Sequence, residues 1–314
     1  MSTNTEINKN CVEKQGICPP PSQGGVRRRV CIVTGADGGM GYEETKAVAQ
    51  AGYHVIMACY SPQLAEPRRQ QLLQETGLPA EQVEVMGIDL ANLASVRAFA
   101  DRVKALLEAH SDWTLQLLMN NAGTMETGRH YTVDGLERTV SVNYVGPYLL
   151  TRLLADLMPH GARIVNMASC VYAIGHLDFP EFFEQGRKGS FWRIPVYSNT
   201  KLAITLFSLD MAERLRDRGI TVNACDPGIV STGIIRMQMF FDPITDLIFR
   251  PCIRTPRQGA DTAIRLLLEE EKEGITGRFW LSNKDRNLSK KYYQHKQMKE
   301  LWDLTEERVK KFLW

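Results

Sequence analysis

The sequence predicts an α/β fold, a doubly wound parallel sheet of about seven strands with helices on both faces. From Arg29 onward, short β-rich segments alternate with longer segments of helical periodicity. This alternation is typical of a parallel sheet, because the crossover that joins two parallel strands usually contains a helix. Near-continuous apolar segments such as Leu115–Met119 also fit a sheet that is covered on both faces.

Seven segments are predicted as the strands of this sheet. Each is short and mainly apolar, and helical patterns fill the intervals between them. They are Val30–Thr34, His54–Ala58, Val83–Ile88, Leu115–Met119, Arg163–Met167, Thr221–Ala224 and Arg278–Trp280. Since no repeat or long low-complexity segment interrupts the series, we expect a single domain over residues 28–285.

The two ends of the chain differ from this pattern. Residues 1–27 are polar and contain Pro19–Pro21 and Gly24–Gly25, a composition that buries too little apolar surface to fold, so we expect a flexible tail. Residues 286–314 carry apolar side chains at helical spacing opposite a charged face, which predicts a helical extension packed on the domain. The same pattern also fits a helix lying on a membrane surface.

Composition limits the partners and the compartment. The 314 residues are 44% hydrophobic and 24% charged, with a net charge of +2 and interleaved acidic and basic residues, which argues against a nucleic-acid partner. The odd number of cysteines, seven, indicates free thiols, and the scattered histidines predict no metal site. No apolar run is long enough for a transmembrane helix, and the polar N-terminus lacks a signal-peptide core, so we expect a cytoplasmic protein.

A glycine-rich turn follows the first predicted strand. Gly35, Gly39 and Gly41 stand between Thr34 and a helical segment that begins near Tyr42. Glycine permits a tight turn and a close backbone approach, and the free N–H groups at a helix N-terminus bind a pyrophosphate. A glycine turn alone would also suit a plain loop, but its place between strand and helix predicts a Rossmann-type dinucleotide site.

A tyrosine and a lysine are spaced four residues apart at the start of a later helical segment. Tyr197 and Lys201 would share one face of that helix and bring phenol and ammonium groups together. A free tyrosine has a pKa of roughly 10, so a nearby cation is needed to stabilise its phenolate near neutral pH. The pair by itself would equally suit ordinary surface pairing.

Further motifs occur in the order found in one family. The glycines have the spacing Gly-x-x-x-Gly-x-Gly, Asp89-Leu90 ends the third predicted strand, Asn120-Asn121-Ala122-Gly123 ends the fourth, and Asn143 and Ser169 precede the Tyr197/Lys201 pair. In these features the chain resembles the short-chain dehydrogenase/reductase family, and from Arg29 to Trp280 its retinol dehydrogenase and protochlorophyllide reductase branch. Taken singly, Asp89 would also suit a helix N-cap, and the asparagine motif an ordinary turn.

The resemblance implies a set of site residues. Tyr197 would exchange a proton with the substrate oxygen, Ser169 would hold that oxygen, Lys201 would support the tyrosine and touch the nicotinamide ribose, and Asn143 would position a water in a proton relay. The implied cofactor contacts are Gly35, Asp37, Gly39, Met40, Gly41, Tyr60, Asp89, Leu90, Asn121, Ala122, Gly123, Tyr197, Lys201, Pro227, Gly228, Ile229 and Thr232. The segment around Pro227 would also suit a strand-ending turn.

The choice between NAD and NADP leans weakly to NAD. In this branch an arginine usually follows the Ala-Cys that ends the second strand, whereas here Tyr60 follows Ala58-Cys59. Asp37 stands where Asn or Ser is common, and a carboxylate there would repel a 2′-phosphate. NADP remains almost equally open, since Arg68 or Arg69 could reach back from the next helix.

The expected activity is hydride transfer between a nicotinamide cofactor and a hydroxyl or carbonyl group of a lipophilic small molecule, such as a steroid, bile acid or retinoid-like alcohol. Aromatic residues between Ser169 and Tyr197 and apolar residues around 234–249 would wall such a substrate, or would simply pack in the core. Those before Tyr197 are Phe179, Phe182, Phe183, Phe191 and Trp192.

Three other functions stay open at this point. The first is reduction of a carbon–carbon double bond, in which the same tyrosine would protonate carbon. The second is nucleotide sensing without turnover, although both Tyr197 and Lys201 are present. The third is sugar epimerase chemistry, for which the chain after Thr232 looks too short. By analogy, a homo-oligomer would form through helices expected at about 131–158 and 196–217.

Overall fold

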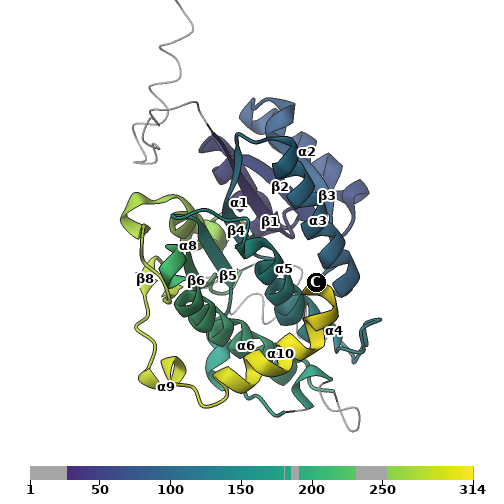
Figure 1. The fold of residues 1–314 in the computed structure, drawn as a ribbon, viewed down its shortest axis with the longest axis vertical. Helices are drawn as coiled ribbons and strands as arrows, with labels where there is room; N and C mark the ends of the chain where they lie inside the picture. Colours follow the sequence, from purple (N-terminus) through teal and green to yellow (C-terminus); the bar gives the residue numbers. More distant parts are fainter. Residues whose placement is uncertain (1–26, 180, 185–190, 231–252, 314) are drawn as a thin grey trace, which may run out of the picture.

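A single mixed sheet forms the centre of the protein (Figure 1). The computed structural model describes residues 27–179, 181–184, 191–230 and 253–313. In that part of the chain, eight strands lie in the order β3-β2-β1-β4-β5-β6-β7-β8, and all neighbours are parallel except β7 and β8. The predicted α/β fold is therefore confirmed, and the added strand is a short antiparallel hairpin partner at the edge.

All seven predicted strands form, with ends that differ by a few residues. Their bounds are β1 Arg28–Thr34, β2 His54–Cys59, β3 Val83–Gly87, β4 Trp113–Asn120, β5 Arg163–Met167, β6 Thr221–Asp226, β7 Phe279–Leu281 and β8 Lys284–Asp285. The strand order reverses between β1 and β4, and in doubly wound sheets ligands bind at such a reversal, outside the carboxyl ends of the strands.

Helices cover both faces of the sheet (Figure 1). On one face, buried side chains pack beneath α1 Gly39–Gln50, α2 Pro62–Thr76 and α8 Pro256–Leu268. The other face is covered by α3 Leu93–Ala109, α5 Gly146–Ala155 and α6 Arg193–Arg214, with α10 Met298–Leu313 outside α5 and α6. Two further α-helices in the described residues are short, α4 Arg138–Val140 and α9 Lys290–Tyr293.

The helix expected from residue 131 begins later than the sequence pattern indicated. Tyr131 forms an isolated antiparallel bridge with Glu137, and Gly135 between them has φ = 76°. Helix α4 therefore begins at Arg138, and a π-helical turn at Ser141–Val145 joins it to α5. The second expected helix, at 196–217, corresponds to α6, which begins and ends about one turn earlier.

Helix α10 packs along α5 and α6 (Figure 1). The Trp302 ring contacts the Tyr148 ring, with centroids 5.1 Å apart, and the Arg214 guanidinium lies 3.5 Å from its centroid. Arg152 forms an ion pair with Glu306 at 2.7 Å. The apolar face of this helix is thus in contact with the body of the protein.

Glu44 of α1 has its carboxyl group in the core, and this predicts a pH-dependent stability. Its side chain is fully buried, neither oxygen has a hydrogen-bond partner among the described residues, and burial raises its pKa to about 8. Because the folded pKa lies above the unfolded value of about 4.3, the folded state retains a proton that the unfolded state releases. Stability is therefore lost as pH rises from about 4.3 to 8.

We expect Glu44→Gln to be more stable than the original chain at pH 8, by on the order of a few kcal/mol, and closer to it at pH 5. Urea unfolding at both pH values measures the difference. Glu43→Gln, at a half-buried neighbouring position, is the matched control. Equal pH dependence in the Glu44 variant and the original chain would contradict the prediction.

Candidate active site

A cavity of about 420 Å³ opens at the carboxyl ends of β1, β2, β3 and β4. Most of the predicted cofactor contacts line it. They are Gly35, Asp37, Gly39, Met40, Gly41, Tyr60, Asp89, Leu90, Asn121, Ala122 and Gly123. Tyr197, Lys201, Pro227, Gly228 and Ile229 do not line this cavity, and Thr232 lies outside the described residues.

The glycine turn is packed closely against the segment that follows β4. Gly35 has φ = 62°, and a Cβ atom on Gly41 would clash with the Gly35 carbonyl and lie 2.7 Å from Asn121 Nδ2. Asn121 Nδ2 donates to Thr34 O at 2.9 Å. No side chain caps the N-terminus of α1, so its first N–H groups remain available to an anion.

These features fit a bound dinucleotide. Only glycine gives the backbone this approach, and the turn directs helix N–H groups where a pyrophosphate would lie. A side chain in place of Gly41 would fill the space between the glycine turn and the segment after β4.

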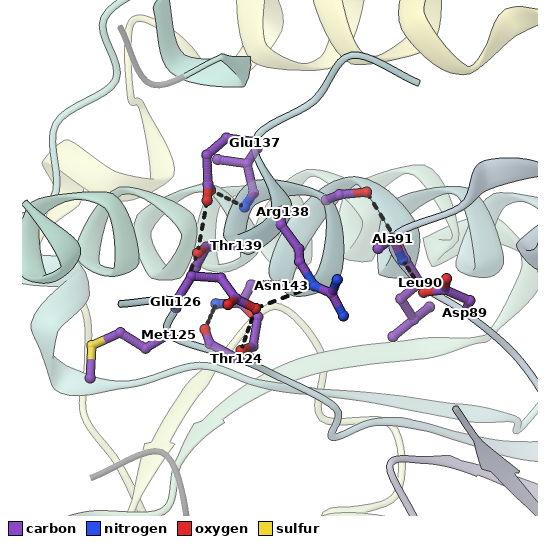
Figure 2. A network of polar contacts seen from close by, with 12 residues as sticks. Asp89, Leu90, Ala91, Thr124, Met125, Glu126, Glu137, Arg138, Thr139 and Asn143 are labelled. Atoms are coloured by element: carbon purple, nitrogen blue, oxygen red, sulfur yellow. Dashed lines mark hydrogen bonds and ion pairs between the residues drawn. The ribbon is translucent and has the colours of Figure 1, made fainter. Parts of the chain in front are cut away.

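Asp89 does not cap helix α3. The N-cap is Asn92, whose Oδ1 accepts from Ala94 N at 3.1 Å and Ser95 N at 3.3 Å. Asp89 Oδ1 instead accepts from Ala91 N at 2.8 Å, which closes the turn beside the cavity (Figure 2). The helix-cap interpretation is therefore wrong, and the carboxylate stands at the cavity wall.

Asn143 lies in the π-helical turn and is bonded to two other segments, the one after β4 (Figure 2) and helix α6. Its Nδ2 donates to Thr124 O at 2.8 Å and to Thr200 Oγ1 at 3.1 Å, and its Oδ1 accepts from Thr124 N at 2.7 Å. Both amide hydrogens are thus used within the protein. Asn143 joins the segment after β4 to helix α6, which carries the tyrosine and lysine.

Lys201 and Tyr197 lie together on α6, as their spacing predicts. Lys201 Nζ lies 5.4 Å from the centroid of the Tyr197 ring and donates to Met167 O at 2.8 Å. Burial lowers the pKa of Lys201 to about 8, against the raising influence of Asp226. Burial, with Asp226 and Cys170, raises the pKa of Tyr197.

In the protein alone, burial is the largest cause of the raised pKa of Tyr197. Tyr197 consequently retains its proton at neutral pH and is suited to act as an acid. The role of Lys201 in stabilising the phenolate stays a prediction.

Ser169 lies between β5 and the 3₁₀ turn Cys170–Ile174, with an extended backbone. That turn is pressed against α6, since a Cβ atom on Gly175 would lie 2.5 Å from the carbonyl oxygen of Ser198. The absence of a side chain at Gly175 thus allows the serine segment to approach the helix that carries Tyr197. Sequence reasoning missed Gly175.

The Pro-Gly turn follows β6. Gly228 has φ = 74°, and its N–H donates to Asp226 Oδ1 at 2.9 Å. Arg254 Nη1 donates to Pro227 O at 3.1 Å. The turn is therefore held from two sides.

Several cavity residues were not expected from the sequence. Arg138 and Glu126 form an ion pair of 3.3 Å, and Thr124 Oγ1 donates to the Glu126 carboxylate at 3.2 Å (Figure 2). Val142 also lines the cavity, one helical turn after Arg138. The only sequence signal for these residues was their closeness to the asparagine motif and to Asn143.

The aromatic residues before Tyr197 divide between core and surface. Phe182 and Phe183 are buried in the core, and Phe179 packs partly against it. Trp192 is 71% exposed. The second expected wall, around 234–249, lies outside the described residues.

The chain matches the family model for short chain dehydrogenases over residues 29–182 and 184–239. It is 34% identical to retinol dehydrogenase 14 of Mus musculus over 295 residues, covering 90% of this chain and 86% of that protein. It is 35% identical to human retinol dehydrogenase 11 (Homo sapiens) over 282 residues, covering 87% and 84%.

Two solved structures share the fold. An uncharacterised protein from Mycobacterium Paratuberculosis has a TM-score of 0.71 and 26% identity, covering 91% of this chain and 94% of that one. A short chain dehydrogenase from Burkholderia cenocepacia, in complex with NADP, has a TM-score of 0.64 and 22% identity, covering 82% and 99%.

The chain belongs to the short-chain dehydrogenase family. Within that family it is an NAD(P)-dependent dehydrogenase/reductase of the retinol dehydrogenase-like branch.

The Gly41 contacts predict that Gly41→Ala abolishes nucleotide binding. The added methyl group would clash with the Gly35 carbonyl and push the Asn121 amide aside, and overpacking of this kind costs about 1–3 kcal/mol of stability. Fluorescence titration with NADH and NADPH measures binding. Gly128→Ala, whose Cβ would lie 3.6 Å from the His130 side chain, is the control. Unchanged affinity in Gly41→Ala would show that the turn does not hold the cofactor.

Proposed function

We propose that this protein transfers hydride between a nicotinamide cofactor and a hydroxyl or carbonyl group of a lipophilic small molecule. The observation that carries the proposal is the Tyr197/Lys201 pair on α6, held at the carboxyl ends of β4 and β5 by Asn143 and by Met167 O. A nucleotide bound along the glycine turn would supply or accept the hydride.

In the reductive direction, Tyr197 donates its proton to the carbonyl oxygen of the substrate. The carbonyl carbon of the substrate receives the hydride from the nicotinamide, so the product is the alcohol. The raised pKa of Tyr197 supports this assignment, because a buried tyrosine holds its proton until a developing oxyanion takes it. The adjacent Lys201 ammonium then stabilises the phenolate. Ser169 would hold the substrate oxygen, and Asn143 would support the relay that returns the proton.

Two observations favour a lipophilic substrate. Trp192 and Ile194 near the start of α6, Ile174 in the serine segment and Ile229 after the Pro-Gly turn are exposed, by 71%, 52%, 68% and 45%. These residues flank Ser169, Tyr197 and Gly228 in the chain, where a substrate would enter. The relatives are named retinol dehydrogenases, so a retinoid-like alcohol or aldehyde is our first candidate, before steroids and bile acids.

We further propose a preference for NAD over NADP. Asp37, Asp89 and Glu126 line the cavity together with a single described cation, Arg138, which is already paired with Glu126. Of the two arginines that could have reached the ribose, Arg68 stacks on the Tyr42 ring at 4.1 Å and Arg69 pairs with Glu66 at 2.8 Å. An excess of negative charge disfavours a 2′-phosphate.

Location and assembly stay predictions. In the part of the chain that the structure describes, no helix has both the length and the apolar character needed to cross a bilayer. The described residues contain four free cysteines, of which three are buried. Free thiols favour a cytoplasmic location, because thiols stay reduced in that compartment. Any homo-oligomer through α5 and α6 would have to include α10, which lies on both.

The activity is tested by incubating the purified protein with retinoid, steroid and bile-acid alcohols or carbonyls and each nicotinamide cofactor, with product analysis. We expect interconversion of alcohol and carbonyl, and reduction of a carbon–carbon double bond instead would favour the alternative reaction.

Tyr197→Phe should lower kcat by about 10²–10⁴-fold with nucleotide affinity nearly intact, because only the transferable proton is lost. Retained turnover in that variant would refute the proposed acid.

Tyr60→Arg tests the cofactor preference. Tyr60 is 70% exposed and follows β2, so an arginine there can reach a ribose 2′-phosphate. Hydrogen bonds to charged groups are worth about 1.5–3 kcal/mol, so NADPH should bind about tenfold tighter or more. NADH affinity should change little, and Tyr60→Gln serves as the uncharged control. Tighter binding of NADPH than NADH by the original chain would contradict the NAD preference.

A further inference from the structure

Asp226, at the end of β6, carries a buried carboxylate beside the active-site segments. Its side chain is 1% exposed, and it stands beside the end of β5, since Met167 and Cys225 are register partners in the two strands. A buried carboxylate needs hydrogen-bond donors to compensate for its lost hydration. The donors identify what Asp226 holds.

Both carboxylate oxygens accept from backbone N–H groups of the active-site segments. Oδ2 accepts from Cys170 N at 2.9 Å, directly after Ser169. Oδ1 accepts from Gly228 N at 2.9 Å, within the Pro-Gly turn. A third bond, from Ala168 N to Cys225 O at 2.8 Å, runs in parallel between the same strands. One side chain therefore joins the serine segment to the turn after β6.

The same carboxylate influences the tyrosine and the lysine. It raises the pKa of both Tyr197 and Lys201, in the lysine against the effect of burial. Lys201 reaches this region through its bond to Met167 O at 2.8 Å. The titratable groups that face Asp226 are Tyr197 and Lys201 from α6, Cys170 and Tyr172 from the 3₁₀ turn, and Cys225 from β6, and Arg254 holds the neighbouring Pro227 carbonyl.

We propose that Asp226 is a positioning residue that fixes Ser169 and the Pro-Gly turn relative to each other and sets the charge environment of the Tyr197/Lys201 pair. The proposal rests on the proposed function, because it assigns a role within the same site. A carboxylate suits this role since it offers acceptors only, and two N–H groups converge on it. Asparagine keeps the shape but turns one acceptor into a donor and removes the charge.

Asp226→Asn tests the proposal through the pH profile. Removing a negative charge lowers the pKa of Tyr197 and of Lys201 alike, so the pH profile of kcat should move to lower pH. We also expect kcat to fall about tenfold with a smaller change in KM, because the loss concerns alignment of the reacting groups. A merely structural role would lower stability without moving the profile.

Asp134→Asn is the matched control. Asp134 also accepts from a backbone N–H, that of Leu93 at 2.9 Å, and it faces Lys311 rather than the site. This variant should keep the original pH profile. An Asp226→Asn enzyme that turns over with the original profile would overturn the proposal, whereas no turnover by the original chain with any substrate would count against the proposed function.

A second measurement needs neither turnover nor a folded variant. In the full chain, hydrogen exchange at the Cys170 and Gly228 amides should be slow, because the carboxylate holds both. After correction for intrinsic rates, exchange at these two amides should be as slow as at the Ala168 amide, which bonds to a backbone carbonyl. Fast exchange at both near neutral pH would overturn the bridging role.

Discussion

The close approach between the glycine turn and the segment after β4 is the constraint on which the site depends. Gly41 lies so near the Gly35 carbonyl and the Asn121 amide that a side chain does not fit, and Asn121 in turn donates to Thr34 O. Because this contact bridges β1 and β4, it forms at the point where the strand order reverses. The cavity exists because parallel strands end together there while their helices turn away to opposite faces.

A second set of polar contacts joins the cavity segment and β5 to the helix that carries Tyr197 and Lys201. Asn143 bonds to Thr124 on the cavity side (Figure 2). It also bonds to Thr200 on α6, and Lys201 donates to the end of β5. The bonds to Thr200 and to Met167 O are buried, where an unpaired polar group is costly, so each fixes the position of its partner. The tyrosine and lysine thus lie on a helix whose position is set by several strands, which suits a site that must align a substrate with a cofactor.

The C-terminal helix α10 lies along α5 and α6 and covers part of their outer side (Figure 1). It contacts them through Trp302 and Glu306, which meet Arg214 and Arg152. The sequence predicted its amphipathic character, but periodicity alone left open whether the apolar face would meet the protein or a membrane surface. In the structure, Leu301, Trp302 and Val309 of this helix are buried against the protein body.

Features that depend on local order could be predicted from the sequence alone. The seven strands, the glycine turn and the Tyr197/Lys201 spacing are of this kind, because hydrophobic periodicity and helix geometry act between near neighbours. Three other features became visible in the folded protein: Asn92 rather than Asp89 caps α3, Phe182 and Phe183 enter the core, and burial raises the pKa of Tyr197. Capping, burial and desolvation depend on groups distant in sequence, as does the bond between Cys170 and Asp226. Their positions are fixed by the crossing of strands and helices and not by any local pattern.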